Sequence, residues 1–175
     1  MVVERGEQSG RQLVVLDTSV LLNFLRVGRL DLLVRLPGHE FLVTDHVRLE
    51  VTDGECATML DVALRHEHLR EERMDAPLEV AAFQQLAAVR ALGLGECAAL
   101  AVAVCRQLPI AIDDKVARKK AQVLFGFEQF VGTAELVVDA IRCGLVDVAA
   151  ADRIKARWEV ELRFRLGFES FAEMV

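Results

Sequence analysis

The chain has 175 residues, of which 53% are hydrophobic and 27% are charged, and this composition is typical of one globular domain with a buried core. It excludes an intrinsically disordered chain, because such chains lack the apolar residues from which a core is built. The formal net charge of −6 argues against a protein that coats nucleic acid through a broad basic surface, but not against an enzyme whose carboxylates hold metal ions.

The sequence carries no signal for a membrane span or for secretion. The longest apolar stretch runs from Cys97 to Cys105, far short of the roughly 20 residues that a membrane span needs. The opening, MVVERGEQSGR, has charges of both signs and no apolar core, so we expect a flexible leader over residues 1–11 and one domain over residues 12–175. The four cysteines show no CxxC spacing, which favours reduced thiols in a cytoplasmic protein over disulfides or a zinc site.

Short apolar runs alternate with helical patterns along the first half of the chain. The run LVVL, which starts at Leu13, predicts a buried strand, and TSVLLNFLRVG predicts a helix that ends at Gly28. RLDLLVRLPG predicts a second short helix, EFLVT a second strand, and DHVRLEV a helix that Asp45 can cap. Between Ala57 and Ala76 the charge density is high and the pattern is weak, which fits one exposed helix and a loop.

The second half continues this alternation with longer helices. Pro77 suits the start of the helix LEVAAFQQLAAVRAL, and ECAALAVAVCRQL predicts a helix that is apolar on nearly all sides and therefore buried. PIAIDD and GFEQFVG predict short strands on either side of a basic amphipathic helix, KVARKKAQVL, and two more helices precede a short tail. Strands that alternate with helices predict an α/β fold, with a parallel sheet flanked by helices on both faces, rich in helix, in a single domain.

Acidic residues stand at strand ends or helix starts in four places, namely Asp17, Glu50, Glu96 and the pair Asp113 and Asp114. The carboxyl ends of parallel strands lie at one edge of a sheet, so these acids can converge although they are far apart in the sequence. Crowded carboxylates repel one another unless divalent cations lie between them, and Mg²⁺ and Mn²⁺ prefer such hard oxygen ligands. Ions of this kind activate water and stabilise the transition state of phosphodiester cleavage.

Each acid also has a purely structural interpretation. Asp17 can cap the helix that follows it, and Glu50 can lie on a solvated helix face. Glu96 stands in a first helical turn, where the helix dipole favours a negative charge, and the Asp113–Asp114 pair can form a polar turn. Taken singly the two interpretations stay open, but the ordered set of acids in one small α/β chain favours the metal site.

The motifs that contain these acids resemble those of the PIN domain family, small α/β nucleases named after the PilT N-terminus. The segments that carry the resemblance are VVLDTSVLLNFL, TDHVRLEV, LGLGECAALAVAVC and IAIDDKVARKKA, in this order. It continues through GTAELVVDAIRCGLV, and the long C-terminal part is similar to a subgroup of prokaryotic PIN proteins with extra C-terminal helices. Two positions depart from many relatives, because Ile112 stands where a Thr or Ser is common and Glu96 where an Asp is common.

The resemblance implies a role for each of several residues. The catalytic acids would be Asp17, Glu50, Glu96 and Asp114, and the metal ligands Asp17, Glu96, Asp113 and Asp114, with Asp113 able to share or replace the role of Asp114. The supporting polar residues would be Thr18, Ser19 and Asn23. Lys115, Arg118 and Lys119 share a helix face and are candidates for contact with RNA, although a merely solvated face is the alternative.

The resemblance also implies an activity and its partners. It points to a Mg²⁺- or Mn²⁺-dependent endoribonuclease of the VapC type, the toxin half of a toxin–antitoxin pair. Such a protein would be cytoplasmic, form a homodimer, be restrained by a small antitoxin protein and have no contact with membranes. The alternative is a PIN fold without catalysis that binds RNA or a partner protein.

Overall fold

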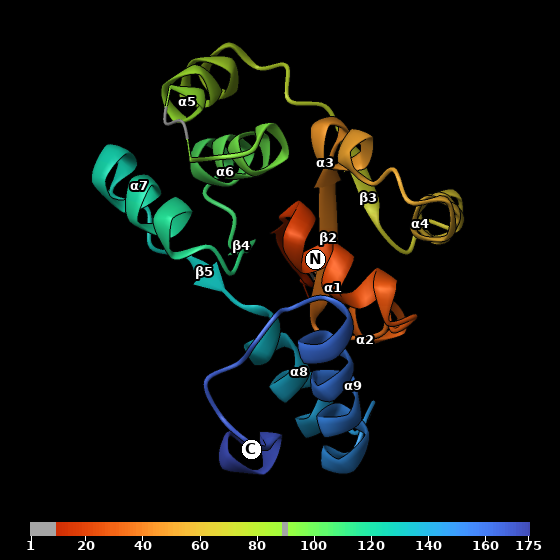
Figure 1. Cartoon of the computed structure of the whole chain (residues 1–175). Coiled ribbons are helices and arrows are strands. Elements are labelled where there is room, and N and C mark those ends of the chain that lie inside the picture. Colours follow the sequence, from red (N-terminus) through yellow and green to blue (C-terminus); the bar gives the residue numbers. More distant parts are fainter. Residues whose placement is uncertain (1–9, 89–90) are drawn as a thin grey trace, which may run out of the picture.

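The computed structural model describes residues 10–88 and 91–175, and its centre is a five-stranded parallel sheet surrounded by helices (Figure 1). Most of the expected leader, residues 1–9, lies outside the described residues. The strands are β1 (Gln12–Leu16), β2 (His39–Thr44), β3 (Arg70–Glu72), β4 (Ile110–Ala111) and β5 (Phe130–Val131). They lie in the order β3-β2-β1-β4-β5, and each neighbouring pair is parallel, as the alternation of strands and helices predicts.

Helices connect and follow the strands, and they make up most of the described residues. Within the described residues these are α1 (Thr18–Arg26), α2 (Asp31–Val34), α3 (Asp45–Glu50), α4 (Gly54–Arg65), α5 (Pro77–Ala87), α6 (Leu94–Arg106), α7 (Lys115–Phe125), α8 (Thr133–Arg142), α9 (Val148–Glu161) and the 3-10 helix η1 (Phe171–Glu173). None of these helices has both the length and the apolar character that a membrane span requires. All four cysteines are unbridged.

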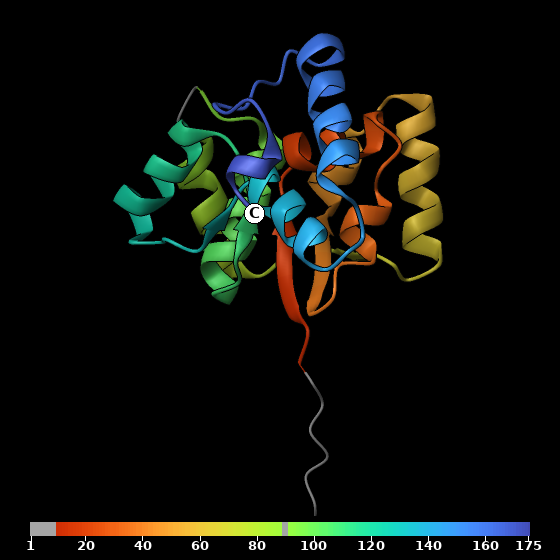
Figure 2. The same ribbon diagram turned by 90° about the horizontal axis from the view of Figure 1, so that it is seen from below.

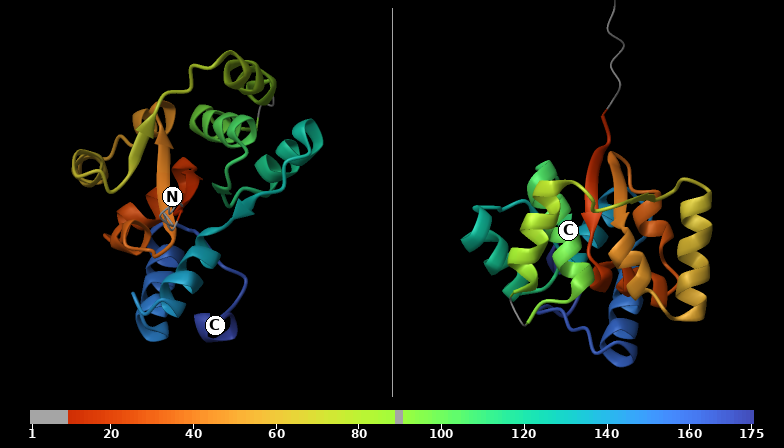
Figure 3. Two further views of the ribbon diagram at one scale, coloured as in Figure 1. Left: turned by 180° about the vertical axis from the view of Figure 1, so that it is seen from behind. Right: turned by 90° about the horizontal axis from the view of Figure 1, so that it is seen from above.

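The strand order places the helices in two layers. The chain runs outward from β1 through β2 to β3, then crosses back to β4 on the other side of β1, and finally reaches β5. Because parallel crossovers are right-handed, this reversal puts the later connections on the opposite face. Figures 1 and 3 show α5, α6 and α7 on one face of the sheet, and α2, α8 and α9 on the other. The reversal makes the gap between the ends of β1 and β4 a topological switch point, where α/β sheets bind ligands.

Helix α6 forms the centre of the core on one face. Its residues from Cys97 to Ala103 are fully buried, and it packs against α5, β1, β2 and β4. Four alanines in this run let the helix approach the sheet closely, so the nearly continuous apolar pattern is explained by burial on all sides. The amino end of this rigid helix carries Glu96, whose place relative to the sheet is therefore well defined.

Two expectations about the elements are wrong in detail. The charged stretch after residue 57 contains β3, an edge strand with the sequence REE, in addition to a helix. The strand lacks apolar alternation because it forms the rim of the sheet, where charged side chains are tolerated. Thr44, not Asp45, caps α3, since the Thr44 side chain accepts a hydrogen bond from the Val47 N–H.

Candidate active site

Asp17 lies at the switch point, immediately after β1. Its backbone N–H donates to the carbonyl of Ala111 at 3.0 Å, which ties the end of β1 to the end of β4. The side chain is 2% exposed and caps α1 by accepting bonds from the backbone N–H of Ser19, at 3.1 Å, and from the Ser19 hydroxyl. Both bonds end on Oδ2, so the cap does not use Oδ1. The structural interpretation of Asp17 is thus correct, and it leaves one carboxylate oxygen for another partner.

The environment of Asp17 disfavours its negative charge. Burial raises the pKa of Asp17 above its ordinary value of 3.8, and the bonds from Ser19 offset part of this rise. The charge on Glu50 raises the pKa further. A buried carboxylate with another carboxylate near it is stabilised when a cation binds, because both causes of the shift then act in the opposite direction.

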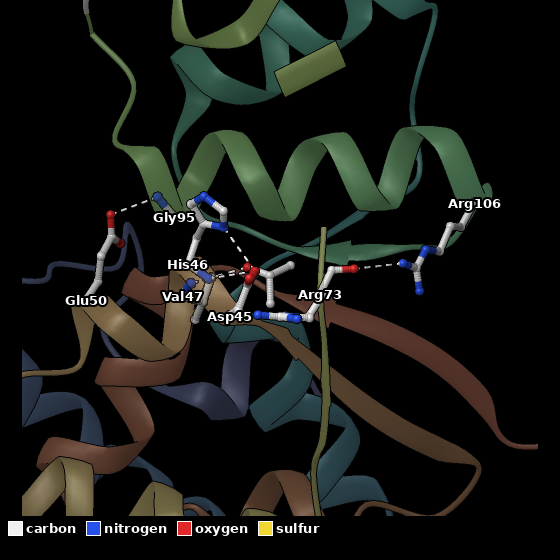
Figure 4. A network of polar contacts seen from close by, with 8 residues as sticks. Asp45, His46, Val47, Glu50, Arg73, Gly95 and Arg106 are labelled. Atoms are coloured by element: carbon white, nitrogen blue, oxygen red, sulfur yellow. Dashed lines mark hydrogen bonds and ion pairs between the residues drawn. The ribbon is translucent and has the colours of Figure 1, made fainter. Parts of the chain in front are cut away.

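Glu50 occupies the carboxyl end of α3 and is held by two donors from other helices. The Thr18 hydroxyl donates to Oε2 at 2.6 Å. The Gly95 N–H donates to Oε1 at 2.8 Å, as Figure 4 shows. A Cβ on Gly95 would lie 2.2 Å from Oε2 and 2.6 Å from the Thr18 hydroxyl, so a side chain at position 95 would displace the Glu50 carboxylate from its two donors. Gly95 is a site residue that reasoning from the sequence missed, and its signal was a glycine directly before a candidate acid.

Glu96 shows most clearly that the acids have converged. It stands in the first turn of α6 and is half-buried. Burial raises its pKa from 4.5 to about 7, and the charges of Asp17, Asp114 and Glu50 add to the rise. The charges of three acids from separate parts of the sequence thus act on the carboxylate of Glu96.

The two neighbouring aspartates after β4 have different partners. Asp114 caps α7, and its Oδ1 accepts from the N–H groups of Val116 at 2.6 Å and Ala117 at 2.9 Å, which leaves Oδ2 outside the cap. Asp113 instead accepts from Thr133, with Oδ1 bound to the backbone N–H at 2.9 Å and Oδ2 to the hydroxyl at 2.5 Å. Both oxygens of Asp113 are thus engaged, whereas Asp114 joins the charge cluster around Glu96.

Thr133 connects three elements at this edge of the sheet. Its hydroxyl accepts a bond from Asn23 Nδ2 at 3.2 Å, while its N–H and hydroxyl hold Asp113. Thr133 is buried and opens α8 directly after β5, as Thr18 opens α1 after β1. Reasoning from the sequence missed its role, although a polar residue between a strand and a helix was the available signal. Of the three supporting polar residues, Thr18 contacts Glu50, Ser19 contacts Asp17, and Asn23 contacts Thr133.

The basic residues of α7 are in different situations. Lys115 and Lys119 are exposed, while Arg118 is half-buried. The Arg118 guanidinium donates to the carbonyl of Ile112, with Nε at 2.8 Å, and lies 5.6 Å from the centre of the Phe130 ring. Arg118 thus fastens α7 to the segment that carries the aspartates. A contact of these three residues with RNA stays a prediction.

A cleft of about 380 Å³ opens beside the acids. Its lining is Ser19, Leu22, Asn23, Arg26, Asp113, Asp114, Leu162, Arg163 and Phe164. Side chains of α1 and the two aspartates meet a segment from the end of α9 there, so the cleft joins the acidic edge to the C-terminal part of the chain. A larger cleft of about 810 Å³ lies between α3, α4 and β3, but it contains none of the candidate acids of the active site.

The donor chemistry of the acidic cluster fits a divalent cation. Carboxylate oxygens are the ligands that Mg²⁺ and Mn²⁺ prefer, and Asp17 Oδ1 and Asp114 Oδ2 are oxygens that the helix caps do not use. The side chains are turned toward their protein donors, and among the described residues no three His, Cys, Asp or Glu side chains are arranged to coordinate one ion together. The fit thus concerns the donor set and its charge, including the repulsion that raises the pKa of Glu96.

Comparison with known proteins agrees with this architecture. A family model described as a PIN domain matches residues 13–159, which include all the candidate acids. No protein of curated function matches the chain. PIN domains are usually nucleases and typically use divalent metal ions, so at this coarse level the chain carries a nuclease-type module. Since the match extends over most of the sequence and the sheet, the chain belongs to the PIN domain family.

Proposed function

We propose that the chain is a metal-dependent endoribonuclease whose active site consists of Asp17, Glu50, Glu96 and Asp114. The observation that carries this proposal is geometric: Glu50 accepts from Thr18 and Gly95, the residues next to Asp17 and Glu96, and the Asp17 N–H donates to the carbonyl of Ala111, at the end of the strand that Asp113 and Asp114 follow. Stability does not explain such a cluster, because like charges close together oppose folding. A site for a divalent cation does explain it, and family membership supports hydrolysis of RNA.

Some residues of the site would bind the cation, and others hold neighbouring segments in place. Asp17, Glu96 and Asp114 would hold Mg²⁺ or Mn²⁺, because the first and third each keep one oxygen outside a cap and the charges of both reach Glu96. Such a cation would lower the pKa of a water molecule and stabilise the charge that develops on phosphate oxygens. Asp113 is better explained as a holding residue, since Thr133 occupies both of its oxygens.

Glu50 and Glu96 act differently within the site. Glu50 binds the Thr18 hydroxyl and the Gly95 N–H, so it holds the starts of α1 and α6 in a fixed relation. Glu96, whose pKa is raised to about 7, would hold a cation only in its ionised form, so cation binding would compete with protonation of this carboxylate. Cation affinity is therefore expected to rise with pH.

The wider biological role is part of the same proposal. The motif resemblance and the C-terminal helical extension favour a toxin of the VapC type, restrained by a small antitoxin protein, as a homodimer in the cytoplasm. The residues from 12 to 175 would act as one domain. A second candidate is a PIN fold that binds RNA or a protein without cutting, and the lack of three acids arranged around one ion position in the described residues favours it.

A cleavage assay separates the two candidates. Purified protein is incubated with labelled RNA in Mg²⁺, Mn²⁺ or EDTA, together with Asp17→Asn and His66→Ala variants. We expect cleavage only with a divalent cation, near-complete loss in Asp17→Asn, and little change in the exposed control His66→Ala. Cleavage that resists EDTA, or that persists in Asp17→Asn protein, would contradict the nuclease proposal. Binding of RNA without cleavage under every condition would favour the second candidate.

A further inference from the structure

The cleft beside the acids has a second wall, built by the segment that follows α9. Figures 1 and 2 show the chain turning back after α9 and ending beside α8. On this path Arg163 and Phe164 line the cleft opposite α1, which contributes Arg26. Both residues of the second wall lie beyond residue 159, where the match to the PIN domain ends.

We propose that this cleft binds the RNA strand next to the cleavage site, with Arg26 and Arg163 on backbone phosphates and a base against Phe164. The inference rests on the proposed nuclease function, and it names single-stranded RNA as the substrate because only an unpaired base is free to stack on a side chain. It also gives the C-terminal segment a role in substrate binding.

The cleft carries two arginines beside an acidic site. The chain has a net charge of −6, and its active site is acidic, so an RNA strand is repelled unless cationic groups stand beside the site. Arg26 and Arg163 are exposed, and neither forms an ion pair within the described part of the chain. By contrast, Arg29 and Arg157 are each held by a carboxylate two or four residues away. The cleft thus places two available guanidinium groups on the same depression as Asp113 and Asp114.

The second wall of the cleft is fixed in place at Phe164. Phe164 is half-buried and packs edge-on against Trp158, with ring centres 5.7 Å apart and an angle of 77° between the planes. Trp158 is fully buried, and its indole N–H donates to the carbonyl of Asn23 in α1 at 2.7 Å. The aromatic face is therefore fixed relative to the helix that begins beside Asp17, and a base stacked there would lie at a defined place along the strand.

The backbone of Arg163 makes the turn that ends α9. It has φ of +55°, the left-handed conformation that glycine adopts most easily, and the Phe164 N–H turns back to the carbonyl of Trp158 at 3.1 Å. An arginine there costs stability relative to glycine. Glu67 and Gln107 have the same conformation at the ends of α4 and α6, so the positive φ is the ordinary way in which a helix ends. At the end of α9 this turn places Arg163 and Phe164 on the wall of the cleft.

Binding is tested with a fluorescent single-stranded RNA of twelve nucleotides and the full chain in EDTA, with the intact probe checked on a gel. The variants are Arg26→Gln, Arg163→Gly, both together, and Phe164→Leu; the control is Arg165→Gln, which removes an exposed arginine outside the cleft. Thermal melting of each variant is measured in parallel. Arg163→Gly is the sharpest variant, because we expect it to melt at the same or a higher temperature while it binds RNA more weakly.

The double variant should bind about tenfold more weakly, and the slope of log Kd against log salt should fall by about 1.4, since each phosphate contact on a single strand contributes about 0.7. Phe164→Leu should weaken binding by at least about fivefold without changing the slope. Duplex RNA should bind wild type more weakly than the single strand. Variants that bind like wild type, or an equal loss in Arg165→Gln, would overturn the inference.

The outcomes also separate this inference from the proposed nuclease function. Cleavage of RNA combined with unchanged binding by the variants leaves the nuclease standing and removes the RNA-binding cleft. Weakened binding by the variants without any cleavage supports the cleft and contradicts the nuclease. Failure of wild type to bind the single strand, or tighter binding of a polyglutamate peptide, overturns the cleft as an RNA site and would assign it to an acidic protein.

Discussion

Two acidic regions lie near opposite ends of α6, and their charges are balanced in different ways. Figure 4 shows the two ends of this helix, with Gly95 and Glu50 at one and Arg106 at the other. At the carboxyl end, Arg106 donates to Glu72 and, at 2.6 Å, to Glu79, so each acid there has a guanidinium beside it. At the amino end, Asp17, Glu50 and Asp114 accept bonds from N–H and hydroxyl groups, and no Lys or Arg of the described residues forms an ion pair with these three acids or with Glu96.

The two regions differ in the groups that surround their buried or half-buried acids. Glu79 is 3% exposed, and the chain supplies Arg106 as its counter-charge. Glu96 is half-buried, and its pKa rises to about 7 because burial disfavours its charge and because its charged neighbours are carboxylates instead of a guanidinium. Glu72 and Glu79 are thus paired with a cation of the chain itself, whereas no Lys or Arg in the described residues pairs with the acids at the switch point, which is what the proposed metal site requires.

The largest expected effect separates the two regions by activity. Glu96→Gln removes a ligand charge while it preserves shape, and Glu72→Gln makes the same chemical change at the other end of α6. We expect RNA cleavage to fall at least about 100-fold in the first variant, more than the loss of an outer-shell partner of a metal costs. The second variant should keep its activity to within a few fold. Rates are measured at saturating Mn²⁺, with circular dichroism as the check on folding.

For the stability of the fold, the carboxyl end of α6 is expected to be the more sensitive of the two regions. Arg106→Met leaves Glu79 buried without its counter-charge, and loss of one partner of a buried pair costs about 3–5 kcal/mol of unfolding free energy. Arg48→Met is the control, since Arg48 pairs with Asp61 and Glu71 on the surface, where an ion pair contributes about 0–1 kcal/mol. Urea unfolding of both variants measures the difference. Equal losses would mean that Arg106 has no special role at the buried end of α6.

The same contrast explains which parts of the site the sequence could predict. Asp17 was predictable because an apolar run stops abruptly on an acid, and Glu96 because an acid opens a helix that is otherwise apolar. The sheet followed from the alternation of strands and helices, whereas β3 did not, since its charged residues carry no strand pattern. Local patterns of this kind depend on neighbours in the sequence, and such neighbours determine elements and their ends.

Contacts between segments that are far apart in the sequence could not be predicted from such local patterns. Asp113 and Asp114 are adjacent, and their roles differ only because Thr133, 20 residues after Asp113, reaches the first of them. The need for glycine at position 95 becomes visible only when Glu50 is known to lie against it. Likewise, Arg163 and Phe164 stand in a tail without periodicity, and their relation to the acids depends on how that tail crosses α1.

The smallest expected effect is the pH dependence of stability, which follows from the raised pKa of Glu96. In the unfolded chain this group ionises near its ordinary value of 4.5, and in the folded chain at about 7. Between these values the folded state binds more protons than the unfolded state, so the contribution of Glu96 to stability is fully present below about pH 4.5 and is lost as the pH rises to about 7. The whole shift corresponds to about 3.4 kcal/mol. Because Glu96 is only half-buried and solvent screens its charge, we expect a fall on the order of 1–2 kcal/mol across this range.

Urea unfolding between pH 4.5 and 7.5 in EDTA, with Glu96→Gln as the matched variant, isolates this contribution from those of other acids. The difference in unfolding free energy between wild type and Glu96→Gln should grow with pH at the expense of wild type, because the amide cannot ionise. Mn²⁺ should reverse the trend in wild type and not in the variant, since a bound cation stabilises the ionised carboxylate. A difference that is flat with pH in EDTA would mean that folding does not raise the pKa of Glu96, either by burial or through its acidic neighbours. In that case the contrast between the two ends of α6 would lose its electrostatic basis, and the cation would have no excess charge to neutralise.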